Sequence, residues 1–145
     1  MPTGTGADDR AIVLLDTSAA IALVVEDHEN HEATLAVVRG RHLGLSGHAW
    51  FETFSVLTRL PAGRRRSPAD AIRILAHDFP ESVFLGEDEA ARLSRDLARL
   101  GVSGGAVYDA LVAAAAKQHG RTLLSGDARA RSVYEAVGVP LEAAG

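Results

Sequence analysis

The stretch AIVLLD, residues 11–16, is a continuous run of apolar side chains that ends abruptly in a carboxylate. A second stretch of the same kind, TLLSGD, covers residues 122–127 near the other end of the chain. Short apolar runs are typical of strands that are buried on both faces of a parallel sheet. Further runs at residues 42–46 and 82–85, with a weaker one near Pro140, therefore predict a central parallel sheet of about five strands.

Segments with helical spacing separate the apolar runs. They cover residues 18–25, 29–39, 48–60, 69–78, 88–100, 106–119 and 128–137. Gly40, Gly101 and Gly120 follow three of them, where a left-handed residue often closes the last turn, and Ser67-Pro68 is a typical helix start. Strands that alternate with helices predict parallel crossovers and a single three-layer α/β/α domain over residues 11–145. The small, polar and Gly-rich residues 1–10 are expected to form a flexible leader.

Composition narrows the class of protein. The chain has 145 residues, the usual size of one domain, and no cysteine, which excludes disulfides, thiolate metal sites and cysteine nucleophiles. Its longest apolar stretch is broken by Asp16 and is too short to span a bilayer, so we expect a cytoplasmic protein without a membrane segment. The net charge of −4 argues against a surface that holds nucleic acid by general phosphate attraction.

Two acidic residues stand directly behind predicted strands. Asp16 follows the first strand and Asp127 follows the run at residues 122–125. Because the carboxyl ends of parallel strands face the crevice where ligands bind, both are candidate site residues. Each has a simpler interpretation as the cap of the helix that comes next, and the sequence alone leaves that alternative open.

Two more acids lie in apolar helices. Asp109 falls in the first turn of the segment at residues 106–119, where the helix dipole favours an acid in any case. Glu52 is surrounded by apolar residues, and its nearest base along the helix, Arg59, is about 10 Å away at about 1.5 Å per residue. A solvated stripe of Glu52, Ser55 and Arg59 is the alternative to a functional role.

The four acids together resemble a known family. LLDTSA (residues 14–19), ETFSVL (52–57), YDALVA (108–113) and LLSGD (123–127) are similar, in order, to the four acidic motifs of PIN-domain ribonucleases, and within that family to VapC-like toxins of toxin–antitoxin pairs. The fourth motif departs from the pattern, because Ser125-Gly126 stands where many members carry Thr and a larger polar residue. The resemblance covers nearly the whole chain.

The resemblance implies a Mg²⁺- or Mn²⁺-dependent endoribonuclease. Hard cations prefer oxygen ligands, and a bound dication can polarise a phosphate and lower the pKa of a water without any protein nucleophile. We expect Asp16, Asp109 and Asp127 to hold the metal directly or through water, and Glu52 to bind it or position the attacking water. Residues expected to orient these acids from behind are Thr17, Ser18 and Ser125.

Partners are implied in the same way. The resemblance suggests an RNA substrate, a cognate antitoxin whose tail masks the acidic cleft, and a homodimer. Arg64, Arg65 and Arg66, called here the basic turn, could hold RNA phosphates, although a solvated loop explains them equally well. The apolar face with Trp50, Phe54 and Leu57 is expected to be core more than interface.

Other function classes find less support. The six histidines show no paired metal-ligand spacing and are expected at the surface, and the chain has no nucleophile elbow, dinucleotide fingerprint or phosphate loop. An aspartyl-phosphate phosphatase would need a second acid two residues after Asp16, where Ser18 stands. A catalytically inactive RNA- or protein-binding module of the same fold stays open as an alternative.

Overall fold

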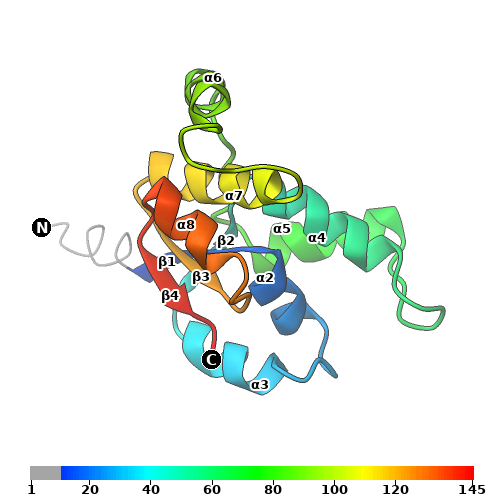
Figure 1. The fold of residues 1–145 in the computed structure, drawn as a ribbon. Coiled ribbons are helices and arrows are strands. Elements are labelled where there is room, and N and C mark those ends of the chain that lie inside the picture. The colour runs from blue at the N-terminus through cyan, green and yellow to red at the C-terminus, as the bar shows by residue number, and fades with distance from the viewer. Residues whose placement is uncertain (1–10) are drawn as a thin grey trace, which may run out of the picture.

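A parallel sheet flanked by helices organises the chain (Figure 1). The computed structural model describes residues 11–145, and the expected leader at residues 1–10 lies outside the described residues. The elements follow in the order β1 (Ile12–Leu15), α2 (Thr17–Val24), α3 (His31–Val38), β2 (His42–Leu45), α4 (His48–Thr58), α5 (Pro68–Asp78), α6 (Glu87–Asp96), α7 (Ala106–Gln118), β3 (Thr122–Ser125), α8 (Arg131–Val137) and β4 (Leu141–Ala143). The strand order is β2-β1-β3-β4, so the first and third strands lie side by side at the centre.

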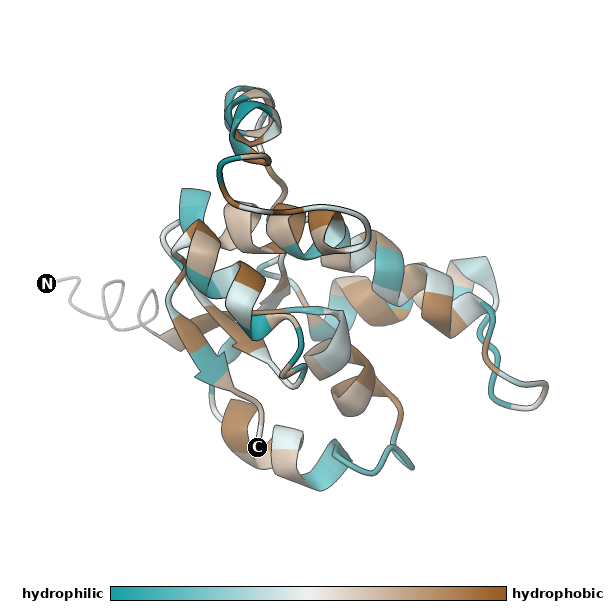
Figure 2. Cartoon of the chain, viewed as in Figure 1, coloured by the Kyte–Doolittle hydropathy of each residue, from teal (hydrophilic) through white to brown (hydrophobic). Residues whose placement is uncertain are grey.

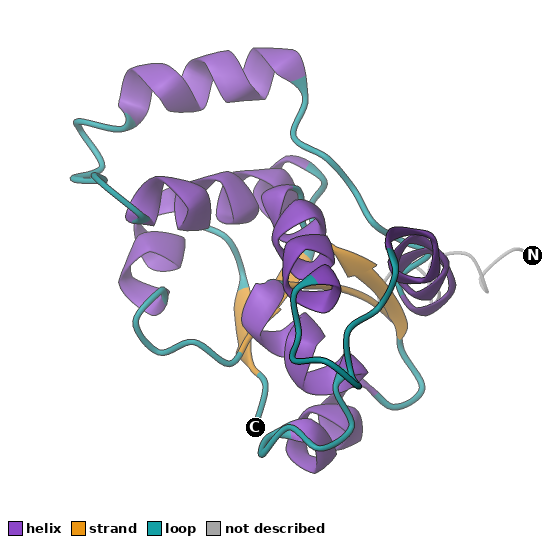
Figure 3. Cartoon of the chain, turned by 90° about the vertical axis from the view of Figure 1, so that its right-hand side faces the viewer, coloured by secondary structure: helices purple, strands orange, loops and turns teal. Residues whose placement is uncertain are grey.

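Both faces of the sheet are buried, as the continuous apolar runs predict. Leu14 and Leu123 belong to a core cluster shared with α7 and α8, while Leu15 and Leu124 belong to a second cluster shared with α2 and α5. All four side chains are fully buried. Figure 3 shows the strands with helices on both sides, and Figure 2 shows the hydrophobic colour of the strands at the centre of the fold. The predicted three-layer α/β/α architecture is confirmed.

The predicted fifth strand is the exception. Residues 82–85 do not form a strand, and the described chain has four strands with one isolated parallel bridge between Ser46 and Val83. The backbone at Glu81 and Val83 does donate to β2, at 2.9 and 3.1 Å. Between these two bonds, however, the amide of Leu45 donates to the hydroxyl of Ser82 at 2.9 Å instead of to a carbonyl. This side-chain acceptor interrupts the ladder that a strand would need.

Helix ends agree with the sequence signals in most places. The hydroxyl of Ser67 accepts from the amide of Asp70 and Pro68 opens α5. Gly40 and Gly120 take positive φ values of 78° and 65° just after α3 and α7. The segment expected at residues 88–100 is shorter as a helix, since α6 ends at Asp96 and continues in turns. No helix among residues 11–145 combines the length and the apolar character needed to cross a bilayer.

Candidate active site

All four predicted acids line one cavity beside the carboxyl ends of β1 and β3. Its volume is about 570 Å³. Asp16 follows β1, Asp127 follows β3, Glu52 comes from α4, and Asp109 comes from the first turn of α7. The other residues around the cavity are Thr17, Ser18, Gly105, Ala106, Val112, Arg129, Val133 and Tyr134. Four carboxylates from distant parts of the sequence therefore face a single space.

Asp16 is both a helix cap and a cavity residue. Its Oδ1 accepts from the amide of Ala19 at 3.0 Å, which caps α2, and from the hydroxyl of Ser18 at 2.6 Å. Its Oδ2 accepts from the hydroxyl of Tyr134 at 2.8 Å. Only 2% of the residue is exposed. Asp16 therefore caps α2 and lines the cavity at the same time, and its role as a site residue stays a prediction.

Glu52 takes its partner from another helix. The hydroxyl of Thr17 donates to Oε1 of Glu52 at 3.1 Å, joining α4 to the start of α2. Arg59 instead donates from Nε to the hydroxyl of Ser55 at 3.3 Å on the exposed side of α4. The proposed stripe of Glu52, Ser55 and Arg59 is thus incomplete, because Glu52 turns toward the cavity.

The pKa of the Asp109 carboxyl shows the effect of the negative charge in the cavity. Burial raises the pKa of its carboxyl above the ordinary value, and the charges of Asp127, Glu52 and Asp16 raise this pKa further. The positive charge of Arg129 opposes the shift. The acids are therefore close enough to repel one another in the absence of a cation.

Asp127 sits in a turn held by its neighbours. Its amide donates to the hydroxyl of Ser125 at 3.0 Å, and its Oδ1 accepts from the amide of Arg129 at 2.9 Å. Since α8 begins only at Arg131, Asp127 does not cap that helix, and the simpler interpretation of this residue is wrong. Ser125 supplies the hydroxyl contact expected at the fourth motif.

The donor set can be compared with what a metal needs. Among residues 11–145, no three Asp, Glu or His side chains converge tightly enough to form a ready-made metal-binding group. The chemistry of the cavity nevertheless fits Mg²⁺ or Mn²⁺, since four carboxylates line it and a hard cation prefers oxygen ligands. Mg²⁺ usually keeps several waters and needs only one or two direct carboxylates, so acids spread around a cavity suit it.

Two cavity residues were missed by the sequence analysis. Tyr134 of α8 is 1% exposed and bonded to Asp16, and both burial and the charge of Asp16 raise the pKa of its hydroxyl above the usual value. Among residues 11–145, Arg129 is the one base that lines the cavity, and its Nε lies 3.5 Å from Oδ1 of Asp127. Neither residue carries a sequence signal, because both reach the acids only through the path of the loop after β3.

The basic turn lies elsewhere. It belongs to the loop between α4 and α5, at the far tip of that helix pair in Figure 1, and none of its residues lines the acidic cavity. Arg64 forms an ion pair with Asp27, and Arg65 donates to the carbonyl of Leu60 at 2.9 Å. A role in RNA binding stays a prediction for this turn.

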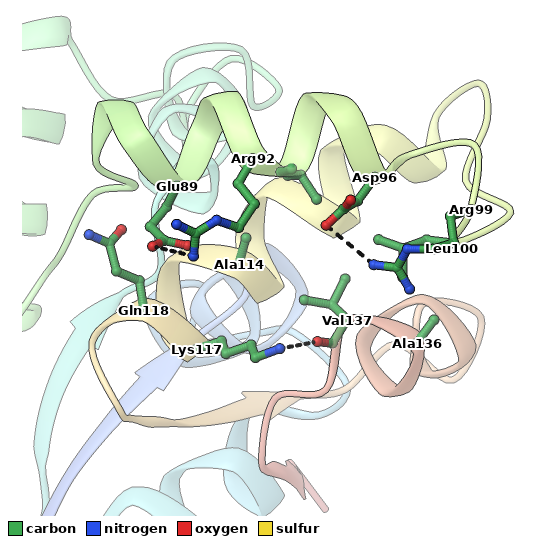
Figure 4. Close-up of a pocket in the computed structure, with 11 residues that line it drawn as sticks. Glu89, Arg92, Asp96, Arg99, Leu100, Ala114, Lys117, Gln118, Ala136 and Val137 are labelled. Atoms are coloured by element: carbon green, nitrogen blue, oxygen red, sulfur yellow. Dashed lines mark hydrogen bonds and ion pairs between the residues drawn. The ribbon is translucent and has the colours of Figure 1, made fainter.

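A second cavity of about 470 Å³ lies between α6, α7 and α8 (Figure 4). Arg92 and Arg99 are paired with Glu89 and Asp96, each at 3.2 Å. Lys117 donates to the carbonyl of Val137 at 2.9 Å, at the end of α8. Each of these three cations already has a partner within the protein. The polar residues of this cavity therefore serve contacts within and between the helices, and they do not indicate a ligand site.

Comparison with known proteins agrees with this arrangement. The model of the PIN domain family matches residues 13–136. The chain belongs to the PIN-domain family. Ribonuclease VapC27 of Mycobacterium tuberculosis is 47% identical to it over 125 residues, which cover 86% of this chain and 91% of that protein. Ribonuclease VapC40 of the same species is 43% identical over 130 residues, covering 88% and 95%. Among PIN domains this one is therefore VapC-like, as its four motifs predict.

Solved structures support the fold of this PIN domain. VapBC2 from Rickettsia felis, bound to a DNA fragment from its promoter, matches with a TM-score of 0.64 at 15% identity, over 91% of this chain and 98% of that chain. FitAB bound to an IR36 DNA fragment matches with a TM-score of 0.62 at 20% identity, over 91% and 94%. At these identities the likeness concerns the fold alone.

Proposed function

We propose that this PIN domain is a divalent-cation-dependent endoribonuclease that acts in the cytoplasm as the toxin of a toxin–antitoxin pair. The observation that carries the proposal is that four carboxylates from β1, α4, α7 and the loop after β3 line one cavity. Relatives that are named ribonucleases and match over most of their length support the reaction. The VapC-like character supports a cognate antitoxin as partner.

The acids divide the work in this proposal. Asp16, Asp109 and Asp127 hold a Mg²⁺ or Mn²⁺ ion, directly or through water, and Glu52 contributes to the same ion or orients the attacking water. When bound, such a dication would polarise the scissile phosphate and lower the pKa of a water. Thr17 holds Oε1 of Glu52, Ser18 holds Oδ1 of Asp16, and Ser125 fixes the turn that presents the fourth acid.

Repulsion between the four carboxylates is a further reason to expect a bound cation, because a cation would relieve it. Burial raises the pKa of Asp109, and the negative charges of Asp127, Glu52 and Asp16 raise it further, because like charges close together disfavour ionisation. A dication between the acids would reverse it and keep the carboxylates ionised. The charge pattern therefore favours cation binding over a cavity that works empty.

The proposal is tested with purified protein stripped of metal. Cleavage of a mixed pool of single-stranded RNA should appear on titration with Mn²⁺ or Mg²⁺ and should be lost in Asp109→Asn. Asp88→Asn is the matched control, because Asp88 is an exposed acid in the first turn of α6. A folded protein that leaves RNA intact at every metal concentration would favour the inactive binding module instead. Full activity in Asp109→Asn would overturn the assigned roles.

A homodimer is also part of the proposal. Phe51 and Phe84 are about half exposed, and their rings lie 6.0 Å apart on a surface that continues to Trp50. Exposed aromatic side chains of this kind are enriched at protein interfaces. Trp50, Phe54 and Leu57 pack in the core, as expected. Phe51 is the aromatic residue of α4 whose side chain is exposed to solvent. Phe51→Ser should shift the protein to monomers in analytical ultracentrifugation, whereas a wild type that is already monomeric would contradict the dimer.

The basic turn is proposed as a weak RNA contact away from the cavity. Replacing its three arginines by Gln should weaken RNA binding and reduce the dependence of the binding constant on salt, since fewer counterions are released. Arg92, Arg95 and Arg99, on and just after α6, provide a control substitution of equal charge. An unchanged salt slope in the first variant would remove the turn from the RNA surface.

A further inference from the structure

The hydroxyl of Tyr134 has no apparent packing purpose. The side chain is fully buried in the core cluster that includes Leu14 and Leu123, where a phenylalanine ring would pack equally well. A buried hydroxyl is unfavourable unless it forms a hydrogen bond. The bond in question runs to Oδ2 of Asp16 at 2.8 Å, across 118 positions of sequence.

This bond determines what Asp16 can offer to the cavity. A carboxylate has about four acceptor sites, two on each oxygen. Oδ1 already accepts from the amide of Ala19 and the hydroxyl of Ser18, and Oδ2 accepts from Tyr134. A single acceptor site therefore remains, on Oδ2, and Asp16 lines the acidic cavity.

Tyr134 also connects two acids. It lies seven positions after Asp127, and its amide donates to the carbonyl of Ala130 at 3.0 Å, within the segment that carries Asp127. The hydroxyl thus fastens the loop that holds the fourth acid to the side chain of the first. Without it, the orientation of Asp16 would depend on local contacts with Ser18 and Ala19 alone.

We propose that Tyr134 is a positioning residue of the cation site: its hydroxyl fixes Oδ2 of Asp16 so that this carboxylate presents one oxygen site to the metal. The inference rests on the proposed cation-dependent function. Donors behind a metal ligand set its orientation, and their removal typically weakens metal binding or activity by about 10- to 100-fold.

The test measures Mn²⁺ affinity directly, by isothermal titration of metal-free protein. Tyr134→Phe should bind Mn²⁺ about 10- to 100-fold more weakly than wild type. Tyr108→Phe is the matched control, because it removes the hydroxyl of the chain's other tyrosine, which is half exposed and stacked on His48. It should bind Mn²⁺ as wild type does.

A second control separates orientation from stability. Val139→Ala shortens a buried side chain of the same core cluster without touching Asp16, so it should lower the melting temperature and leave Mn²⁺ affinity unchanged. If Tyr134→Phe does not fold, amide exchange of the wild type replaces it: saturating Mn²⁺ should slow exchange in α8 more than in α6, no residue of which lines the cavity, and equal slowing in both helices would overturn the inference.

The outcomes are distinguishable. Wild-type protein that binds no Mn²⁺ overturns the proposed cation-dependent function and this inference with it. Wild type that binds Mn²⁺ together with a Tyr134→Phe variant of equal affinity overturns the inference alone. Weaker binding by Val139→Ala, to the same degree as by Tyr134→Phe, would reduce Tyr134 to a structural residue.

Discussion

Replacing Asp109 by Asn should change the stability of this PIN domain in opposite directions with and without metal. Burial and the charges of Asp127, Glu52 and Asp16 raise the pKa of the Asp109 carboxyl, so its ionised form is disfavoured in the folded, metal-free state. Asn has nearly the same shape and carries no charge. In EDTA near pH 7, Asp109→Asn should therefore raise the free energy of unfolding above that of wild type.

Bound metal should reverse this order of stability and make the wild type more stable than Asp109→Asn. A ligand at a hundred times its Kd stabilises the state that binds it by about 2.7 kcal/mol. An unfolding entropy of about 2.1 cal/mol/K per residue gives about 0.3 kcal/mol/K for the 145-residue chain, and hence a rise in melting temperature of about 9 °C. Asp109→Asn lacks one proposed ligand and should gain clearly less at the same Mn²⁺ concentration.

The assay is thermal unfolding followed by circular dichroism at 222 nm, in EDTA and in Mn²⁺. Asp88→Asn serves as control, since the exposed position in α6 should leave both melting temperatures close to wild type. The reasoning is refuted if Asp109→Asn is less stable than wild type in EDTA. It is equally refuted if Mn²⁺ stabilises the variant as much as wild type.

Three further predictions follow from single contacts. In metal-free wild type, the raised pKa of Asp109 means that this group lowers stability as pH rises from the ordinary value of 3.8 through the raised folded value, and denaturant titrations should show this loss in wild type relative to Asp109→Asn. Gly44→Ala would place a Cβ 2.2 Å from the carbonyl oxygen of Glu81, so chemical denaturation should show that the free energy of unfolding falls by about 1–3 kcal/mol. Gly105→Ala is the control: its Cβ would meet open space, so the free energy of unfolding should change by less than about 0.5 kcal/mol. Arg129→Gln removes the base beside Asp127 and should tighten Mn²⁺ binding in calorimetry, because the charge of Arg129 then no longer competes with the metal ion for the cavity; weaker binding would contradict this.

The sheet could be predicted where burial on both faces dictates composition. The runs at residues 12–15 and 122–125 are apolar at successive positions because Leu14 and Leu15 pack into different core clusters. The run at residues 82–85 has similar composition but fails as a strand. Its serine hydroxyl accepts the bond from Leu45 that a backbone carbonyl would accept in a continuous ladder, and composition does not record this exchange.

Two acids of the candidate site could be predicted because their positions follow from topology, whereas the prediction of Glu52 and Asp109, which lie on helices, depended on the resemblance of their motifs. A residue just after a parallel strand must lie at the ligand-binding edge, which places Asp16 and Asp127 there whatever the loops do. Tyr134 and Arg129 could not be predicted in this way. Their contacts depend on how the chain turns after β3 before α8 begins, and a turn of five residues has no periodic signal.

Asp16 shows why structural and functional explanations of an acid need not compete. Its Oδ1 caps α2, while its Oδ2 is held by Tyr134 and retains one free acceptor site, so one side chain serves the fold and the cavity through different atoms. Asp16→Ala would remove both contributions, and the lost cap alone is worth about 0.5–2 kcal/mol. A loss of cleavage in that variant would therefore be ambiguous. Asn caps helices as well as Asp does, so Asp16→Asn keeps the helix start. It removes the charge and replaces Oδ2 by an amide nitrogen, which cannot accept from the hydroxyl of Tyr134, so lost cleavage in that variant reports on the carboxylate in the cavity and not on the helix cap.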